Sequence, residues 1–353
     1  RAAFGTARAF LNGLTAAIEY VTTPAVIVAG IAGYMKAVAP AAPEWVWWVA
    51  FYAIFVFINV KGAALTFNVS MGITALAAAV LIFFYASALL TGSFQWEHAF
   101  NIAPGPGGST FLPLGWHGVF AALPYAVWFY LAIEQLPLSA EESYDAERDM
   151  PKALKWGIAT LLCLSLATLV LNSGVGPGAQ GVGSSNSPLE VGFRAVFPSR
   201  TTSVVLSLIS LTGLIASFHS IIYAYGRLLY ALSRSGYLPG YLGHVGRWRT
   251  PDTALIFGGV LGLGLCFLAA RYAGSVGAAL LNMAVFGALI SYILVLVSFL
   301  RLRAERPHMR RPYRSPLGVA GAFAGIVLAL ICLAATFARS EERRVGKECR
   351  SRW

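Results

Sequence analysis

Charged side chains are scarce in this chain, and their scarcity sets the class of protein. Only 12% of the residues are Asp, Glu, Lys or Arg, whereas an ordinary soluble domain has about a quarter. Hydrophobic residues make up 58% of the chain, and the mean hydropathy is +0.68. This composition excludes an ordinary water-soluble domain and predicts a polytopic membrane protein.

Patterned cysteines and catalytic motifs are also missing. Cys163, Cys266 and Cys332 lie inside apolar runs and Cys349 lies in a basic tail, so their spacing gives no disulfide framework and no metal-ligand set. The chain contains no Walker phosphate loop, HExxH or GxSxG sequence. The sequence therefore argues against ATP-driven transport, intramembrane hydrolysis and enzymatic activity. We expect neither a cofactor nor a bound metal ion.

Apolar runs of about 20 residues recur along the chain, which is the length that an α-helix needs to cross a bilayer. Such continuous runs exclude an outer-membrane barrel, because its strands are short and alternate apolar with polar residues. The sequence therefore predicts an all-α membrane protein with nine spans. They lie near 10–34, 45–60, 68–91, 118–143, 153–172, 203–225, 253–270, 276–300 and 316–338.

The basic residues fall in alternate loops, and this predicts how the chain is oriented. A net charge of +11 would suggest a nucleic-acid partner for a soluble protein. In a membrane protein the positive-inside rule explains it instead, so we predict no nucleic-acid partner and a first span entered from the cytoplasm. The predicted cytoplasmic group is Arg1, Arg8, Lys61, Arg148, Lys152, Lys155, Arg227, Arg234, Arg247, Arg249, Arg301, Arg303, Arg306, Arg310, Arg311 and Arg314. The predicted external side has Lys36, Arg194, Arg200 and Arg271.

The loops at 92–116 and 173–201 are then external. They are rich in Gly, Pro, Ser and Asn, so we expect flexible connectors. Short helices are predicted over the mouth at Phe94–Phe100 and Leu189–Phe197.

Both ends of the chain are unusual. The first residue is Arg and no signal peptide precedes the first span. After nine spans the basic tail would be external, against the positive-inside rule, and its string SEERRVGKECRSRW resembles translated vector sequence. We expect a chain shortened at both ends, with residues 339–353 not native to the protein.

The segment from Trp116 to Pro151 has the strongest functional signal. Glu134 lies in an apolar span between Pro124 and Pro137. A charged side chain at the bilayer centre costs at least about 2.5 kcal/mol, so an intramembrane Glu indicates a substrate or ion path. Each proline removes a helical N–H donor. Because unwound backbone at membrane depth lines a cavity, an interrupted span of this kind indicates the binding site of a secondary transporter.

The same segment shows a family resemblance. The string FAALPYAVWFYLAIEQLPLSAEESYDAERDMPKAL resembles the sixth helix and following loop of the amino acid, polyamine and organocation (APC) transporter superfamily. There the span ends in an acidic pair and an R-D-x-P-[KR] sequence, matched here by Glu141, Glu142, Arg148, Asp149, Pro151 and Lys152. Within the superfamily the chain is most similar to bacterial ethanolamine permeases, through EYVTTPAVIVAGIAGYM at 19–35, VWFYLAIEQLPLSAEES at 127–143 and GLIASFHSIIYAYGRLLYALSRSGYLP at 213–239.

The resemblance covers residues 1–338 and implies a fold of two inverted five-helix repeats. The chain then corresponds to the third through eleventh of twelve helices. The first helix of the family supplies the Gly-rich unwound half of the substrate site, so we expect transport only from the intact protein. The implied function is a secondary permease of the bacterial cytoplasmic membrane that uses an ion gradient to import ethanolamine or a similar small amine.

Ethanolamine is an ammonium ion with one hydroxyl and no carboxylate, so its site needs hydrogen-bond acceptors and aromatic faces. The span around Glu134 offers aromatic rings for cation–π contact, carbonyls freed at a helix break, and an amide for the hydroxyl. Aromatic residues in membrane spans also pack against lipid or a core, and Glu134 has a structural alternative as a hydrogen-bonded carboxylate. Many relatives have Gly where Ala132 stands, which leaves the extent of unwinding open. The candidate substrate-binding residues are Tyr125, Trp128, Phe129, Leu131, Ala132, Ile133, Glu134 and Gln135, with Tyr130 as a further aromatic.

Glu19, in the first span, is a second intramembrane carboxylate. Thr22 and Thr23 share its helix face, and Pro24 follows them. A protonatable Glu there favours a proton over sodium as the coupling ion, although an interhelical hydrogen bond that orients the proline kink explains it equally well. The weaker coupling candidates are two hydroxyls and a titratable ring, Ser217, Ser220 and His219.

The acidic end of the broken span is a candidate cytoplasmic gate, formed by Glu141, Glu142, Arg148 and Asp149. Ion pairs with Arg227 or Arg234 would close the inner mouth. Exposed pairs contribute only about 0–1 kcal/mol each, so a network is needed. The alternative is an ordinary solvated charge run.

Other functions remain open at this point. The main alternative is an amino acid or polyamine permease of the same superfamily. A channel would need polar residues along a continuous pore, and the sequence shows no such pattern. A membrane sensor would be favoured by a large soluble signalling domain.

Overall fold

The computed structural model describes residues 3, 5–36, 39–185, 187–272, 276–311 and 313–350. The side chains at 63–66, 200, 203, 276 and 338–350 are outside that description. Arg1, the side chain of Arg200 and the basic side chains of the 339–353 tail, with Cys349, therefore lie outside the described residues.

All regular elements of the described part are helical, apart from one isolated bridge between Phe94 and Val175, which confirms the all-α prediction. The helices are α1 (Gly5–Met35), α2 (Glu44–Val60), α3 (Ala63–Leu90), α4 (Trp96–Ala99), α5 (Gly115–Phe129), the 3₁₀ helix η1 (Ile133–Glu142), α6 (Ala146–Ser173), α7 (Gly178–Ser184), α8 (Pro188–Val196), α9 (Arg200–Arg234), the 3₁₀ helix η2 (Gly240–Gly243), α10 (Asp252–Tyr272), α11 (Val276–Glu305) and α12 (Gly318–Arg350).

Eight spans in the described residues are long and apolar enough to cross a membrane, which makes the chain a multi-pass membrane protein. The ninth predicted span, 45–60, is α2, a shorter apolar helix of 17 residues. The predicted short helices are α4 and α8. The sequence did not predict α7, because GAQGVGS contains three glycines and no apolar period. Helix α12 continues through the 339–353 tail as far as Arg350, and whether that tail is native stays a prediction.

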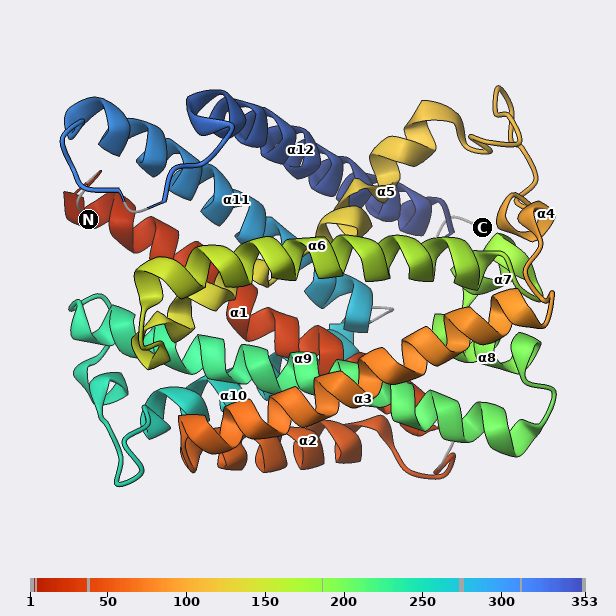
Figure 1. Ribbon diagram of the computed structural model, residues 1–353, viewed down its shortest axis with the longest axis horizontal. Coiled ribbons are helices and arrows are strands. Elements are labelled where there is room, and N and C mark those ends of the chain that lie inside the picture. Colours follow the sequence, from red (N-terminus) through yellow and green to blue (C-terminus); the bar gives the residue numbers. More distant parts are fainter. Residues whose placement is uncertain are drawn as a thin grey trace.

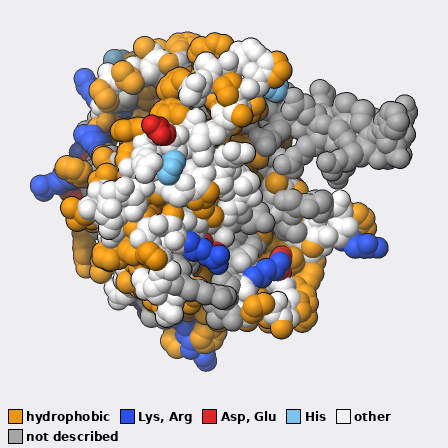
Figure 2. All heavy atoms as spheres, turned by 90° about the vertical axis from the view of Figure 1, so that its right-hand side faces the viewer, with side chains coloured by type: hydrophobic (Ala, Val, Ile, Leu, Met, Phe, Trp, Pro, Cys, Tyr) orange, Lys and Arg blue, Asp and Glu red, His pale blue; other side chains and the backbone are white. Residues whose placement is uncertain are grey.

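The helices run mostly lengthwise, and their connections gather at two opposite ends (Figure 1). The N-terminal end, the start of α6 and the α11–α12 connection lie at the left of that view, and α4, α7 and α8 lie at the right. Figure 2 faces the right-hand end, where hydrophobic side chains and uncharged surface cover most of the described part and Lys and Arg side chains form separate small patches. The predicted cytoplasmic and external loops are thus separated in space, as a two-sided membrane protein requires.

This arrangement predicts a labelling pattern. In the full-length protein with its native cysteines replaced by serine, Ser109→Cys in the 92–116 loop should react with a membrane-impermeant maleimide added to intact cells. Tyr144→Cys in the 139–152 loop should react only after the cells are opened. Both positions are exposed in the structure, so access to the residue itself does not limit the reaction. The reverse pattern would overturn the predicted orientation.

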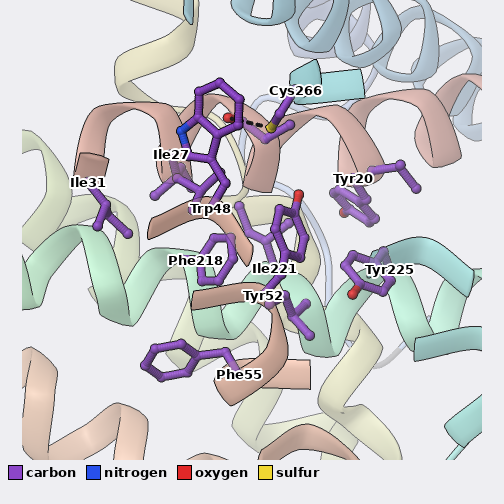
Figure 3. Packing of buried hydrophobic residues seen from close by; sticks show 14 of the residues in the cluster. Tyr20, Ile27, Ile31, Trp48, Tyr52, Phe55, Phe218, Ile221, Tyr225 and Cys266 are labelled. Atoms are coloured by element: carbon purple, nitrogen blue, oxygen red, sulfur yellow. Dashed lines mark hydrogen bonds between the residues drawn. The ribbon is translucent and has the colours of Figure 1, made fainter. Parts of the chain in front are cut away.

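The main core lies where α1 packs against α2, α9 and α10, and it is rich in aromatic rings (Figure 3). Tyr52 of α2 meets Phe218 of α9 edge to face, with ring centroids 5.0 Å apart. Glycines on α10 let these rings approach closely, because a Cβ at Gly258 would collide with the ring of Tyr225. The core therefore fixes α1 against three neighbouring helices.

The other face of α1 packs tightly against α11 through Gly287. A Cβ atom at Gly287 would lie 2.8 Å from the carbonyl oxygen of Thr15 and 3.0 Å from the backbone nitrogen of Glu19. Both atoms belong to the backbone of α1 and cannot rotate away. This contact sets the distance between the two helices beside Glu19.

Replacing Gly287 by Ala is therefore expected to destabilise the protein by about 1–3 kcal/mol, as overpacking does. The thermal unfolding midpoint of the purified full-length protein should fall. Gly264→Ala on α10 is the matched control, because no described atom lies within 4 Å of a Cβ there. Equal midpoints for the two variants would contradict the close contact.

Candidate substrate and coupling site

The predicted break in the span around Glu134 lies at residues 130–132. Helix α5 ends at Phe129, Ala132 has φ 74° and ψ 2°, and η1 begins at Ile133. Among the described non-glycine residues only Ala132 and Arg249 have positive φ, a conformation that costs a residue with a Cβ about 1–2 kcal/mol. The break thus falls between the two prolines and not at either of them. The ring of Pro137 would clash with the carbonyl of Ile133 in an α-helix, which explains why the chain continues as 3₁₀ helix.

Both carboxylate oxygens of Glu134 have hydrogen-bond donors. The backbone N–H of Ala132, freed by the break, donates to Oε1 over 3.1 Å. The hydroxyl of Tyr292 on α11 donates to Oε2 over 2.8 Å. The carboxylate is therefore positioned from two elements, and its place depends on the left-handed turn at Ala132.

Glu19 of α1 lies beside Glu134. Its side chain is 1% exposed, and no described group hydrogen-bonds to its Oε1. Its carboxyl group is close enough to the Glu134 carboxyl to interact with it electrostatically. Tyr20 and Tyr292 are close enough to interact electrostatically with both carboxyls. We call Glu19, Tyr20, Glu134 and Tyr292 the carboxyl cluster.

The charge of the carboxyl cluster is not balanced by a basic side chain. Among the ion pairs of the described residues, none joins a Lys or Arg to Glu19 or Glu134. The buried carboxylate of Glu19 and the half-buried carboxylate of Glu134 repel each other unless a proton or a cation lies between them. The cluster can therefore hold either a proton or a small cation.

The threonines near Glu19 bond to their own helix. The hydroxyls of Thr22 and Thr23 donate to the carbonyls of Ile18 and Glu19, each over 2.7 Å. Pro24 lacks the N–H that would continue the backbone ladder at this point. These bonds therefore stabilise the helix around Pro24, and the carboxyl of Glu19 is left to face Glu134.

The structure separates the predicted aromatic residues. Tyr125 and Phe129 are exposed, at 37% and 49% of their surface, and the hydroxyl of Tyr130 lies 3.0 Å from the Ser165 hydroxyl on α6. Trp128 alone of these rings packs against the core around α1 and against the small cluster of α11 and α12. A role for Trp128 as an aromatic wall for a cation stays a prediction.

Four of the predicted residues lie at or beside the break. The carbonyl of Ala132 accepts the N–H of Gln135 over 3.2 Å, so it is not wholly free for substrate. The side-chain oxygen of Gln135 is buried and has no partner among the described atoms. Leu131 and Ile133 flank the turn, half-buried, and roles for their carbonyls stay predictions.

The coupling candidates on α9 contact residues that do not belong to the carboxyl cluster. His219 is fully buried, 5.3 Å from the Phe55 ring, and its Nδ1 accepts from Nδ2 of Asn59 over 2.9 Å. Nδ2 also donates to the carbonyl of Phe55, which identifies it as the amide nitrogen. Ser220 donates to the carbonyl of Ala216, and Ser217 is exposed. A coupling role for these three residues stays a prediction.

The candidate gate forms around Arg227. One guanidinium nitrogen lies 2.9 Å from Oε2 of Glu141, and the other contacts Oε1 of Glu142. The guanidinium also lies 4.7 Å above the ring of Tyr223. Of the two predicted partners, Arg227 and not Arg234 makes these pairs.

The other two gate candidates, Arg148 and Asp149, lie in the first turn of α6, whose N-cap residue is Asp145. The N–H of Arg148 donates to Oδ1 of Asp145, and Oδ2 of Asp149 accepts from the Ser143 hydroxyl. They fix the start of α6 beside the gate.

Sequence reasoning missed Tyr292. It lies in an apolar run with no charge near it, and its one signal is a phenol inside a span, where a hydroxyl needs a partner. Its partner, Glu134, is 158 residues away in the sequence.

Comparison with known proteins places the chain in a family. A family model described as amino acid permease matches residues 1–348. An uncharacterised transporter of Rhizobium meliloti is 27% identical over 80% of this chain and 58% of its own length. The branched-chain amino acid permease BcaP of Bacillus subtilis is 23% identical (67% and 47%), and the gamma-aminobutyric acid permease of Escherichia coli is 26% identical (64% and 48%).

The chain spans about half the length of these curated relatives. They are transporters and permeases, not enzymes, as the sequence predicted. The chain belongs to the amino acid permease family.

Proposed function

We propose that the intact protein is a secondary permease that imports ethanolamine or a similar small amine across the bacterial cytoplasmic membrane, coupled to a proton gradient. The carboxyl cluster is the observation that supports this. It lies at the break between α5 and η1 and has no basic partner among the described residues. An ammonium ion beside Glu134 would supply the missing positive charge, with Trp128 as an aromatic wall and the free oxygen of Gln135 as a hydroxyl partner.

An amino acid permease is the second candidate, because the named relatives include permeases for branched-chain amino acids and gamma-aminobutyric acid. Such substrates have a carboxylate as well as an ammonium group. They therefore need hydrogen-bond donors or positive charge near the carboxyl cluster. The two proposals differ in that requirement, and a substrate panel separates them.

The deciding experiment measures uptake of labelled ethanolamine into proteoliposomes that contain the full-length protein. Excess unlabelled ethanolamine should remove the uptake, whereas leucine, gamma-aminobutyric acid and putrescine should leave most of it. Protein-free liposomes give the background. Competition by an amino acid, or uptake of an amino acid without uptake of ethanolamine, would favour the second candidate.

We further propose that Arg227 with Glu141 and Glu142 closes the inner mouth. Reversing one side of the pair, by Arg227→Glu or by Glu141→Lys with Glu142→Lys, should lower uptake by about fivefold, because exposed pairs contribute up to about 1 kcal/mol. Combining both reversals should restore most of the uptake. Arg247→Glu on the same side of the molecule is the control. A combined variant that is no better than the single reversals would exclude a pairwise gate.

A further inference from the structure

Two adjoining hollows lie at the end of the molecule that the basic loops assign to the cytoplasm, between the end of α11, the α11–α12 connection and the start of α6. The first has a volume of about 510 Å³ and is lined chiefly by Arg303, Arg310, Arg311, Arg314 and His308. The second has a volume of about 420 Å³, shares the first three arginines, and is otherwise mostly apolar. Figure 1 shows the α11–α12 connection and the start of α6 at this end.

The arginines of these hollows differ in what they already bind. Arg311 donates to the carbonyls of Leu302 and Arg306 over 3.2 and 2.9 Å, so it holds the end of α11. Arg310 reaches Glu147 over 3.2 Å, in a pair exposed on both sides. Arg311 is therefore structural, whereas the pair made by Arg310 is weak and exchangeable.

Arg303 is different, because part of its guanidinium is buried without an acceptor. Its Nε has no hydrogen-bond partner among the described atoms, and the guanidinium lies 4.7 Å above the ring of Phe299. A buried charged donor without a partner is costly. The site therefore favours an oxygen-rich anion, and Arg side chains fit the oxygens of a phosphate in a bidentate manner.

The apolar hollow identifies the source of the phosphate. Phe299 and Leu302 of α11 and Met150 of α6 line it, and the Lys155 ammonium lies 5.0 Å above the ring of Tyr313 at its edge. A free phosphate ion has no apolar group to bury against such a surface, whereas a phospholipid has an acyl chain next to its phosphate headgroup. Basic pockets at the cytoplasmic ends of membrane helices suit anionic lipid headgroups.

We propose that these hollows bind one anionic phospholipid of the inner leaflet. Its phosphate lies against Arg303, Arg310 and Arg314, and the upper part of one acyl chain lies against Phe299 and Met150. The lipid joins α11, which holds Tyr292 of the carboxyl cluster, to the start of α6. Lipid binding should thus stabilise α11, whose Tyr292 positions the Glu134 carboxylate.

The test uses the purified full-length protein in detergent and a fluorescent phosphatidylglycerol, with a fluorescent phosphatidylcholine of the same chain length as comparison. Phosphatidylglycerol should bind at least about tenfold more tightly. Arg303→Gln and Arg314→Gln should each weaken its binding by about fivefold, and the double variant by about 25-fold, since each arginine near a membrane surface contributes about that factor. Arg303→Lys should lose less than Arg303→Gln. Arg247→Gln, a basic residue of the α9–α10 connection, should leave binding unchanged.

Inorganic phosphate distinguishes the two sources of the anion. At 50 mM it should displace little phosphatidylglycerol, and complete displacement would mean a free-anion site and overturn the lipid proposal. Equal affinity for the two lipids would also overturn it. Arg314 is exposed, so its variant should fold even if Arg303→Gln does not. Unchanged lipid binding by a folded Arg314→Gln variant would count against the proposal on its own.

Discussion

Glu134→Gln is expected to reduce ethanolamine uptake by at least about a hundredfold while the amount of protein in the membrane stays the same. The carbonyl oxygen of Gln can still accept from the N–H of Ala132, and its NH2 group can donate to the hydroxyl oxygen of Tyr292, so the turn at the break should survive. It cannot supply the negative charge that an ammonium ion needs. Removing one partner of a buried ion pair costs about 3–5 kcal/mol, which corresponds to a hundredfold or more in affinity.

Two further variants make this result specific. Glu134→Asp keeps the charge on a shorter side chain and should retain part of the uptake. Glu97→Gln removes an exposed carboxylate on α4 and should change nothing. Uptake should be measured at equal amounts of protein in the membrane. Near-normal uptake by Glu134→Gln would leave Glu134 as a structural carboxylate.

Tyr292→Phe tests the new member of the carboxyl cluster. The variant keeps the aromatic ring and removes only the hydroxyl group, which is one of the two hydrogen-bond donors to Glu134. A hydrogen bond to a charged group contributes about 1.5–3 kcal/mol, so uptake should fall by roughly ten- to a hundredfold, less than for Glu134→Gln. An effect equal to that of Glu134→Gln would mean that Tyr292 does more than position the carboxylate.

The sequence was informative about features that lie within one segment. The spans could be predicted because each is a continuous apolar run, and Glu134 could be singled out because a charge in such a run is costly. That the span is broken could be predicted from the two prolines, but the location of the break at residues 130–132 could not. That position depends on a left-handed Ala132, a conformation that propensity disfavours and that the bond to Glu134 helps to hold.

Contacts between distant segments could not be predicted in the same way. The approach of Glu19 on α1 to Glu134 on η1 brings together residues that are more than 100 positions apart in the sequence. Both carboxylates were visible in the sequence, but nothing there placed them side by side. The choice of Arg227 over Arg234 as the gate partner is likewise a matter of helix rotation.

Glu19→Gln is expected to separate substrate binding from energy coupling. Glu19 is the buried neighbour of Glu134. The proposed proton coupling requires that a proton held by this pair leaves when a cation arrives. In proteoliposomes with the full-length protein, an inwardly directed proton gradient without sodium should drive accumulation of labelled ethanolamine several-fold above equilibrium. Glu19→Gln should abolish this accumulation, because a neutral amide cannot release a proton.

The same variant should still exchange labelled for unlabelled ethanolamine, since Glu134 keeps its charge and both of its donors. Exchange is therefore the control that shows a folded, substrate-binding protein. Glu97→Gln is a second control, because it removes an exposed carboxylate on α4, outside the carboxyl cluster. Accumulation that ignores the proton gradient but follows an imposed sodium gradient would make the proton assignment wrong. Glu19 would then be a structural carboxyl that holds α1 against the broken helix.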